Sequence, residues 1–77
     1  MANNNKKVPQ LTKTQRNELA KKLHGISASM KSKTVYRVRY GIDDGITKSN
    51  AETGRLFGIS GEAVRQLIVE IEKSFIK

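Results

Sequence analysis

The chain has 77 residues, a length typical of one small domain with a modest hydrophobic core. It contains no cysteine, which excludes disulfides and thiolate metal sites, and it shows neither a signal peptide nor an apolar run near the ~20 residues of a membrane span. We therefore expect a soluble cytoplasmic protein. Fifteen Lys and Arg residues against seven Asp and Glu residues give a net charge of +8, which favours a polyanionic partner: DNA, RNA or an acidic protein surface.

The positive charge is concentrated in the N-terminal half of the sequence. Residues 1–42 carry ten basic residues and one acidic residue, whereas residues 43–77 carry five basic and six acidic residues. The first half therefore has a net charge of +9 and the second half −1. We expect the first half, including Lys21 and Lys22, to supply sequence-independent attraction to phosphates, and specificity to come from elsewhere.

A polar arm precedes the first predicted helix. Residues 1–10 contain three Asn, two Lys and one Pro and are expected to form a flexible arm, whereas residues 11–77 are expected to form a single helical domain. Thr12 and Gln15 have the spacing of a capping box, which predicts the start of a helix. Gly25 predicts its end, through a residue in the left-handed conformation.

The stretch TVYRVRYG, residues 34–41, is compatible with two structures. As a strand, its tyrosines and Val38 alternate with two arginines, and its aromatic and β-branched residues favour this interpretation. As a helix that begins at Ser29 and ends at Gly41, it places four apolar residues on one face: Met30, Val35, Val38 and Ile42. Because an isolated strand has no partner elsewhere in the chain, we expect the helix.

A loop and two further helices are predicted after this stretch. Residues 42–48 are expected to form the loop because Asp43, Asp44 and Gly45 are turn formers. The two adjacent carboxylates are not interpreted as a metal site, because they lack further oxygen ligands. Ser49 and Glu52 again have capping-box spacing, and the short helix that follows ends near Phe57. Ser60 caps the last helix, whose buried face is expected to contain five apolar residues: Val64, Leu67, Ile68, Ile71 and Phe75.

The sequence thus predicts a small all-α domain of about four helices with a helix-turn-helix motif at about residues 49–75. A short helix, a tight turn at Gly58 and a second helix are the arrangement in which the second helix enters the major groove of DNA. We expect Gly54 to allow close helix packing and Ile59 to fill the core between the helices. Residues 11–77 are therefore predicted to be a DNA-binding domain.

Three side chains near the start of the last helix are predicted to read bases. Glu62 can accept a hydrogen bond from cytosine, Arg65 can donate two to guanine, and Gln66 can pair with adenine. The alternative is an ordinary solvated face of a structural helix. The residues predicted to contact the DNA backbone are eight others: Ser60, Gly61, Arg37, Arg39, Lys48, Arg55, Lys21 and Lys22.

Two segments, VYRVRYGIDDG and SNAETGRLFGISGEAVRQL, resemble region 4 of primary bacterial sigma factors, and the resemblance covers roughly residues 29–75. It implies a helix-turn-helix that binds the minus-35 promoter element and docks on the flap of RNA polymerase. It also implies that Glu62, Arg65 and Gln66 meet DNA and that Arg37 and Arg39 lie near its backbone. Because 77 residues cannot hold the parts of a sigma factor that melt a promoter, we expect a stand-alone region-4-like protein, such as a phage or plasmid regulator.

Some residues depart from this family and support other interpretations. The family usually has a basic residue where this chain has Gly61, and its last helix tends to end basic where this one carries Glu70 and Glu72. These differences suggest a region-4 mimic that binds RNA polymerase or a sigma factor without reading bases. Apolar residues on more than one side of the last helix suggest a homodimer formed through that helix.

No combination of residues points to catalysis. One histidine, His24, and no cysteine leave no nucleophile–base pair, and the sequence contains no phosphate-binding Gly loop or metal-ligand cluster. We therefore predict a non-enzymatic protein without catalytic residues, metal or cofactor, whose main partner is double-stranded DNA.

Overall fold

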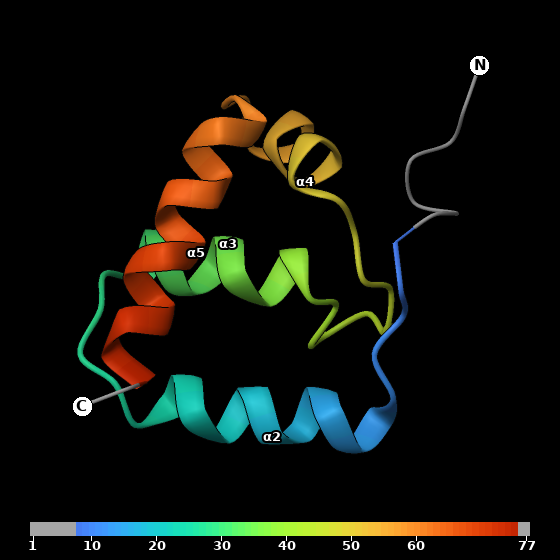
Figure 1. Ribbon diagram of the computed structural model, residues 1–77, viewed down its shortest axis with the longest axis vertical. Helices are drawn as coiled ribbons and strands as arrows, with labels where there is room; N and C mark the ends of the chain where they lie inside the picture. The colour runs from blue at the N-terminus through green and yellow to red at the C-terminus, as the bar shows by residue number, and fades with distance from the viewer. Residues whose placement is uncertain (1–7, 76–77) are drawn as a thin grey trace.

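The computed structural model of the chain describes residues 8–75, so residues 1–7 of the predicted arm and residues 76–77 lie outside the described residues. Within residues 8–75 there are four α-helices and no strand, which confirms the predicted all-α fold. The helices are α2 Lys13–His24, α3 Met30–Arg39, α4 Asn50–Phe57 and α5 Gly61–Phe75. In Figure 1, α2 and α3 lie in two layers, α5 leans across both, and α4 packs beside the start of α5.

Local capping signals place the start of α2 where the sequence predicted it. The Thr12 hydroxyl accepts the Gln15 N–H at 3.1 Å, and the Gln15 side chain accepts the Thr12 N–H at 2.8 Å, which completes the capping box. The helix ends at Gly25 as predicted, but the expected left-handed conformation is wrong, because Gly25 has φ −88° and ψ −1°. The helix instead tightens into i→i+3 bonds, from Gly25 N–H to Lys22 and from Ile26 N–H to Leu23, and needs no left-handed residue.

Residues 30–39 form a helix, and its buried side chains explain why a strand pattern did not prevail. Val35 and Tyr36 are fully buried, and adjacent residues cannot both face one side of a strand. The Tyr36 ring contacts Tyr40 at 4.7 Å and Phe75 of α5 edge-on at 5.8 Å between centroids. Met30 departs from the predicted apolar face and is 83% exposed, because it occupies the first turn, beyond the packed part of α3.

The loop between α3 and α4 is a tightly bonded turn, as its Asp-Asp-Gly run predicted. Gly41 has φ +65°, and a Cβ there would lie 2.4 Å from the Ile46 backbone, so only glycine fits. The Asp44 side chain accepts the Ile46 N–H at 3.0 Å and the Lys48 ammonium at 2.7 Å. Arg37 donates two hydrogen bonds to Asp43. These bonds fix the direction in which the chain enters α4.

Three local signals define the helix-turn-helix. Ser49 caps α4 by accepting the Glu52 N–H at 3.0 Å, and Gly58 ends α4 in the left-handed conformation at φ +70°. Ser60 caps α5 by accepting the Ala63 N–H at 3.0 Å. A Cβ on Gly54 would lie 2.4 Å from the Ile59 carbonyl oxygen, so the close approach permitted by this glycine is between α4 and the turn.

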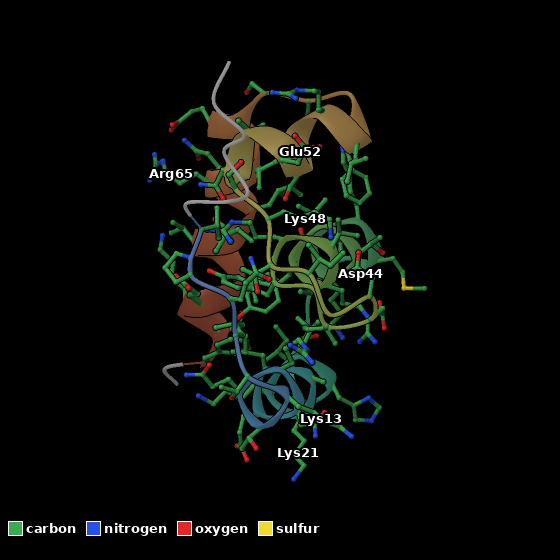
Figure 2. The ribbon with its side chains drawn as sticks, turned by 90° about the vertical axis from the view of Figure 1, so that its right-hand side faces the viewer. Lys13, Lys21, Asp44, Lys48, Glu52 and Arg65 are labelled. Atoms are coloured by element: carbon green, nitrogen blue, oxygen red, sulfur yellow. The ribbon has the colours of Figure 1, made fainter. Side chains whose placement is uncertain are left out.

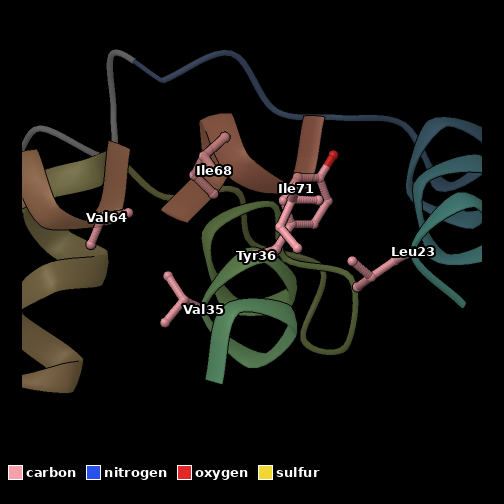
Figure 3. Packing of buried hydrophobic residues seen from close by; sticks show 6 residues of the cluster. All are labelled: Leu23, Val35, Tyr36, Val64, Ile68 and Ile71. Carbon is pink, nitrogen blue, oxygen red and sulfur yellow. The ribbon is translucent and has the colours of Figure 1, made fainter. Parts of the chain in front are cut away.

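The hydrophobic core lies where α5 crosses α2 and α3. Figure 3 shows its six buried side chains: Leu23, Val35, Tyr36, Val64, Ile68 and Ile71. Ile59, Leu67 and Phe75 pack against this cluster, as the helical spacing and the predicted role of Ile59 required. Within the described part of the chain, no helix combines the length and apolarity needed to cross a bilayer.

Candidate nucleic-acid interface

The exposed side chains of the first two turns of α5 form the candidate site. The fold buries Val64 and Ile68, so the opposite side of the same turns, with Glu62, Arg65 and Gln66, faces solvent. All three predicted base-reading residues are exposed and lie together, directly after the turn. The pattern that identified them is therefore a consequence of which face of α5 packs on the core.

These three side chains form one hydrogen-bonded network. Arg65 donates to both carboxylate oxygens of Glu62, with a shortest distance of 2.5 Å, and Gln66 Nε2 lies 3.4 Å from Glu62 Oε2. The bonds from Arg65 and then Gln66 lower the pKa of Glu62, and the bond to Glu62 raises the pKa of Arg65. Both groups are therefore charged at neutral pH, with the donors of Arg65 directed at Glu62.

Ser60 and Gly61 lie where α5 meets the start of α4. The Ser60 hydroxyl is occupied by the Ala63 N–H, and Ser60 itself is exposed. Gly61 is half-buried, and a Cβ there would lie 3.3 Å from the Ala51 backbone. This close packing gives a structural reason for glycine at a position where the sigma resemblance implies a basic residue.

The two arginines of α3 differ in their surroundings. Arg39 Nε donates to Asn50 Oδ1 at 2.6 Å, and Asn50 adjoins Gly61, so Arg39 lies next to the start of α5. Its guanidinium carbon also lies 4.8 Å from the centre of the Tyr40 ring. Arg37 lies on the loop side, where its hydrogen bonds to Asp43 raise its pKa. The sequence analysis gave Asn50 no role. Only its position directly after the Ser49 cap could have indicated that it lies near the start of the last helix.

The remaining predicted backbone contacts are not gathered at this face. Arg55 is exposed on α4 and pairs with Glu52 at 3.1 Å. Lys48 is only 8% exposed, and its ammonium donates to Asp44 and to the carbonyls of Val38 and Ile46. Because these acceptors already surround the Lys48 ammonium, the structure gives this residue a place inside the loop rather than on a DNA-facing surface.

Lys21 and Lys22 lie on α2, away from the start of α5. Figure 2 shows Lys21 at the lower end of the molecule and Arg65 in its upper part. The Lys22 ammonium lies 5.9 Å from the centre of the Phe75 ring, at the C-terminal end of α5. The structure therefore separates these two lysines from the three predicted base-reading residues. Within residues 8–75, no group of three potential ligands among His, Cys, Asp and Glu could hold a metal ion.

The fold and the exposed face define a small all-α domain with a C-terminal helix-turn-helix. Over 37 residues, the chain is 43% identical to RNA polymerase sigma factor SigA of Listeria monocytogenes and, equally, of Listeria innocua; this match covers 48% of the chain and 10% of each relative. It is 37% identical over 54 residues to sigma factor SigA1 of Synechococcus elongatus, covering 68% of the chain and 14% of the relative.

These comparisons show similarity to part of the sigma factors only. The chain spans between a tenth and a seventh of the length of these relatives. No family model and no solved structure matches the chain. The chain therefore carries a segment similar to a region of bacterial sigma factors, in agreement with the resemblance seen in the sequence.

Proposed function

We propose that the protein is a sequence-specific, DNA-binding transcription regulator that reads a promoter or operator through its helix-turn-helix. The observation that carries this proposal is the exposed group of Glu62, Arg65 and Gln66 at the start of α5. These side chains are the types that recognise base edges in the major groove. The similarity to sigma factors supports a role in transcription.

In this proposal the side chains around the start of α5 have separate roles. Glu62, Arg65 and Gln66 contact base edges, with Arg65 exchanging its bonds to Glu62 for bonds to guanine. Arg39 and Ser60, which lie next to this face, and Arg55, which is exposed on α4, contact phosphates and so position the helix without reading sequence. We propose no catalytic residue and no cofactor for the protein, and a cytoplasmic location.

The first experiment selects bound duplexes from a random DNA pool at near-physiological salt, and an enriched motif is the expected result. Gln66→Ala should then weaken binding by about 1–3 kcal/mol at one base position and relax the preference there. Binding curves against the motif and its single-base variants measure this effect.

The matched control is Thr14→Ala, a neutral exposed residue on α2 whose change should leave every duplex bound alike. Equal losses on all duplexes from Gln66→Ala would contradict base reading by this residue. The absence of an enriched motif would contradict the proposal as a whole.

A second candidate function is a protein-interaction module that binds RNA polymerase or a sigma factor without reading bases. It is favoured by Leu56, an apolar residue of α4 that is 59% exposed, and by the uncharged Gly61 at the start of α5. Binding to purified RNA polymerase that is lost in Leu56→Asn, with no motif enriched from the DNA pool, would favour this second function over the first.

A further inference from the structure

Three residues on α2 form an exposed polar row at the end of the molecule distant from Arg65. Lys13, Asn17 and Lys21 are four residues apart in succession, which places them on one side of the helix, and all three are exposed. We call this set the α2 row. Figure 2 shows Lys13 and Lys21 on the outer side of α2, pointing away from the rest of the protein.

Within residues 8–75, no ion pair uses the charges of the α2 row, and of its two lysines only Lys21, in the last turn of α2, is favourably placed next to the helix dipole. The four ion pairs among residues 8–75 involve Arg37, Lys48, Arg55 and Arg65, and neither Lys13 nor Lys21 takes part. Lys13 is also in the first turn of α2, which contains no acidic residue. A cation there is unfavourable next to the positive end of the helix dipole, so Lys13 does not serve helix stability.

The chemistry of the row fits a phosphate backbone better than a protein surface. Lysine and asparagine side chains are common donors to phosphate oxygens, whereas protein interfaces depend on aromatic and other large anchors, which the row lacks. Successive members lie about 6 Å apart along the helix axis, so the row extends about 12 Å and spans several phosphates of one DNA strand.

We propose that the α2 row binds the phosphate backbone of a second DNA segment while α5 lies on the first. Lys13 and Lys21 project from α2 away from the body of the protein, so a duplex seated on the exposed start of α5 does not lie against them. One molecule then holds two duplexes, the first at the exposed start of α5 and the second through phosphates alone. This inference goes beyond the proposed function and does not depend on base reading by α5.

A two-duplex capture assay tests the proposal. A biotinylated duplex that the protein binds is immobilised, and capture of a fluorescent duplex of unrelated sequence is measured at rising salt. The wild-type protein should capture the second duplex and lose it as the salt concentration rises. Lys13→Gln/Lys21→Gln should reduce capture by about tenfold or more, with less than about a twofold change in Kd for a short immobilised duplex alone.

Two control variants separate this effect from loss of net charge and from base reading. Lys31→Gln/Lys33→Gln removes the same charge from α3 and should retain most of the capture. Gln66→Ala should change the amount of protein on a motif duplex but not the capture per bound molecule. Failure of the proposed base reading would therefore leave the capture result intact and distinguishable.

Three results would overturn the proposal. Retained capture in Lys13→Gln/Lys21→Gln would indicate bridging by a homodimer through two α5 helices. Weaker binding of this variant to the single short duplex, with a smaller salt dependence, would place the α2 row on the same DNA as α5. No capture of the second duplex by the wild-type protein would exclude binding of a second DNA segment. If the α2 row then bound polyglutamate, its partner would be an acidic protein.

Discussion

At the scale of single residues, backbone proximity decides which positions tolerate a side chain. Gly54 was expected to permit close packing, and the structure supplies its partner, the carbonyl of Ile59 in the turn. The resemblance implied that a basic residue is missing at Gly61, and the structure shows that this glycine packs against Ala51. The sequence shows that a glycine is present but not which backbone atom lies opposite, because that depends on how two helices meet.

Replacement of Gly54 by alanine should destabilise the fold. Its Cβ would lie 2.4 Å from the Ile59 oxygen, so the turn would have to move, and we expect a loss of about 1–3 kcal/mol in the free energy of unfolding. Urea denaturation measures this change. Gly25→Ala is the matched control, because its Cβ would lie no closer than 3.9 Å to the nearest atoms and should change stability by less than about 1 kcal/mol. Similar losses in both variants would contradict the steric argument.

Lys48 shows a different limit of sequence reasoning. Its charge alone suggested a phosphate contact, but its ammonium is surrounded by one carboxylate and two carbonyl oxygens of the loop. Burial of a lysine is uncommon without such partners, and these partners come together only when the loop is folded. A charge pattern therefore identifies candidate contacts but cannot exclude those that the fold uses internally.

At the scale of elements, local signals were sufficient to predict where helices begin. Thr12, Ser29, Ser49 and Ser60 each accept a hydrogen bond from a backbone N–H in the first turn of the following helix. The end positions of α2 and α4 were also predicted correctly, whereas the conformation of Gly25 and the exposure of Met30 were not, because they depend on the direction of the next segment and on tertiary packing. The helical state of residues 34–39 was likewise decided by burial of Tyr36 against α5.

The loop between α3 and α4 should make stability depend on pH in the acidic range. The hydrogen bond from Lys48 lowers the pKa of Asp44 below its usual value near 4. A carboxyl whose pKa is lower in the folded state stabilises the fold above its unfolded pKa, and this contribution is lost as pH falls through the folded value. We therefore expect Asp44→Asn to reduce the free energy of unfolding by about 1–2 kcal/mol at pH 7, limited by solvent screening of the half-exposed carboxylate.

The difference between wild type and Asp44→Asn should shrink as the pH falls below about 4, since the wild-type carboxyl then becomes neutral as well. Denaturation curves at several pH values measure it. Glu70→Gln, an exposed change on α5, serves as the control. A difference that stays constant down to low pH would show that the Asp44 charge does not support the loop.

At the scale of the whole molecule, the core is unevenly shared among the helices. α2 contributes one fully buried side chain, Leu23, whereas α5 contributes Val64, Ile68 and Ile71. The N-terminal segment is also tied to the loop, because the Gln10 side chain and the Thr47 backbone exchange two hydrogen bonds of 2.9 Å. Gln10, the last residue of the predicted arm, is therefore attached to the loop, and this attachment and the Leu23 packing both hold α2 in place.

Amide hydrogen exchange should reveal this uneven distribution. We expect α2 amides to exchange through a partial opening of lower free energy, and α3 and α5 amides only on global unfolding. Thr47→Val removes an acceptor of the Leu11 N–H and should increase exchange in α2 more than in α5. Uniform protection in all helices would indicate that the domain opens only as a unit.

The sequence predicted how many charged residues each half of the chain carries, but not where they lie on the folded molecule. The sequence correctly locates most cations in the first half of the chain, and it suggested that they hold the DNA read by the last helix. Figure 2 instead shows Lys13 and Lys21 at the end of the molecule distant from Arg65. The arrangement of helices separates Lys13 and Lys21 from Arg65, although Arg39 of the same half lies next to the start of α5, and no periodicity in the sequence specifies that arrangement.

The pairing of Glu62 with Arg65 has a consequence for the speed of target search. With opposite charges held together by direct hydrogen bonds, the tip of α5 presents little net attraction to a passing phosphate backbone. In the proposed function, residence on unrelated DNA through this helix is then brief, and Arg65 exchanges its bonds to Glu62 for the paired acceptors of a guanine. For a protein with that function, the pair would favour rapid rejection of wrong sites over prolonged sliding.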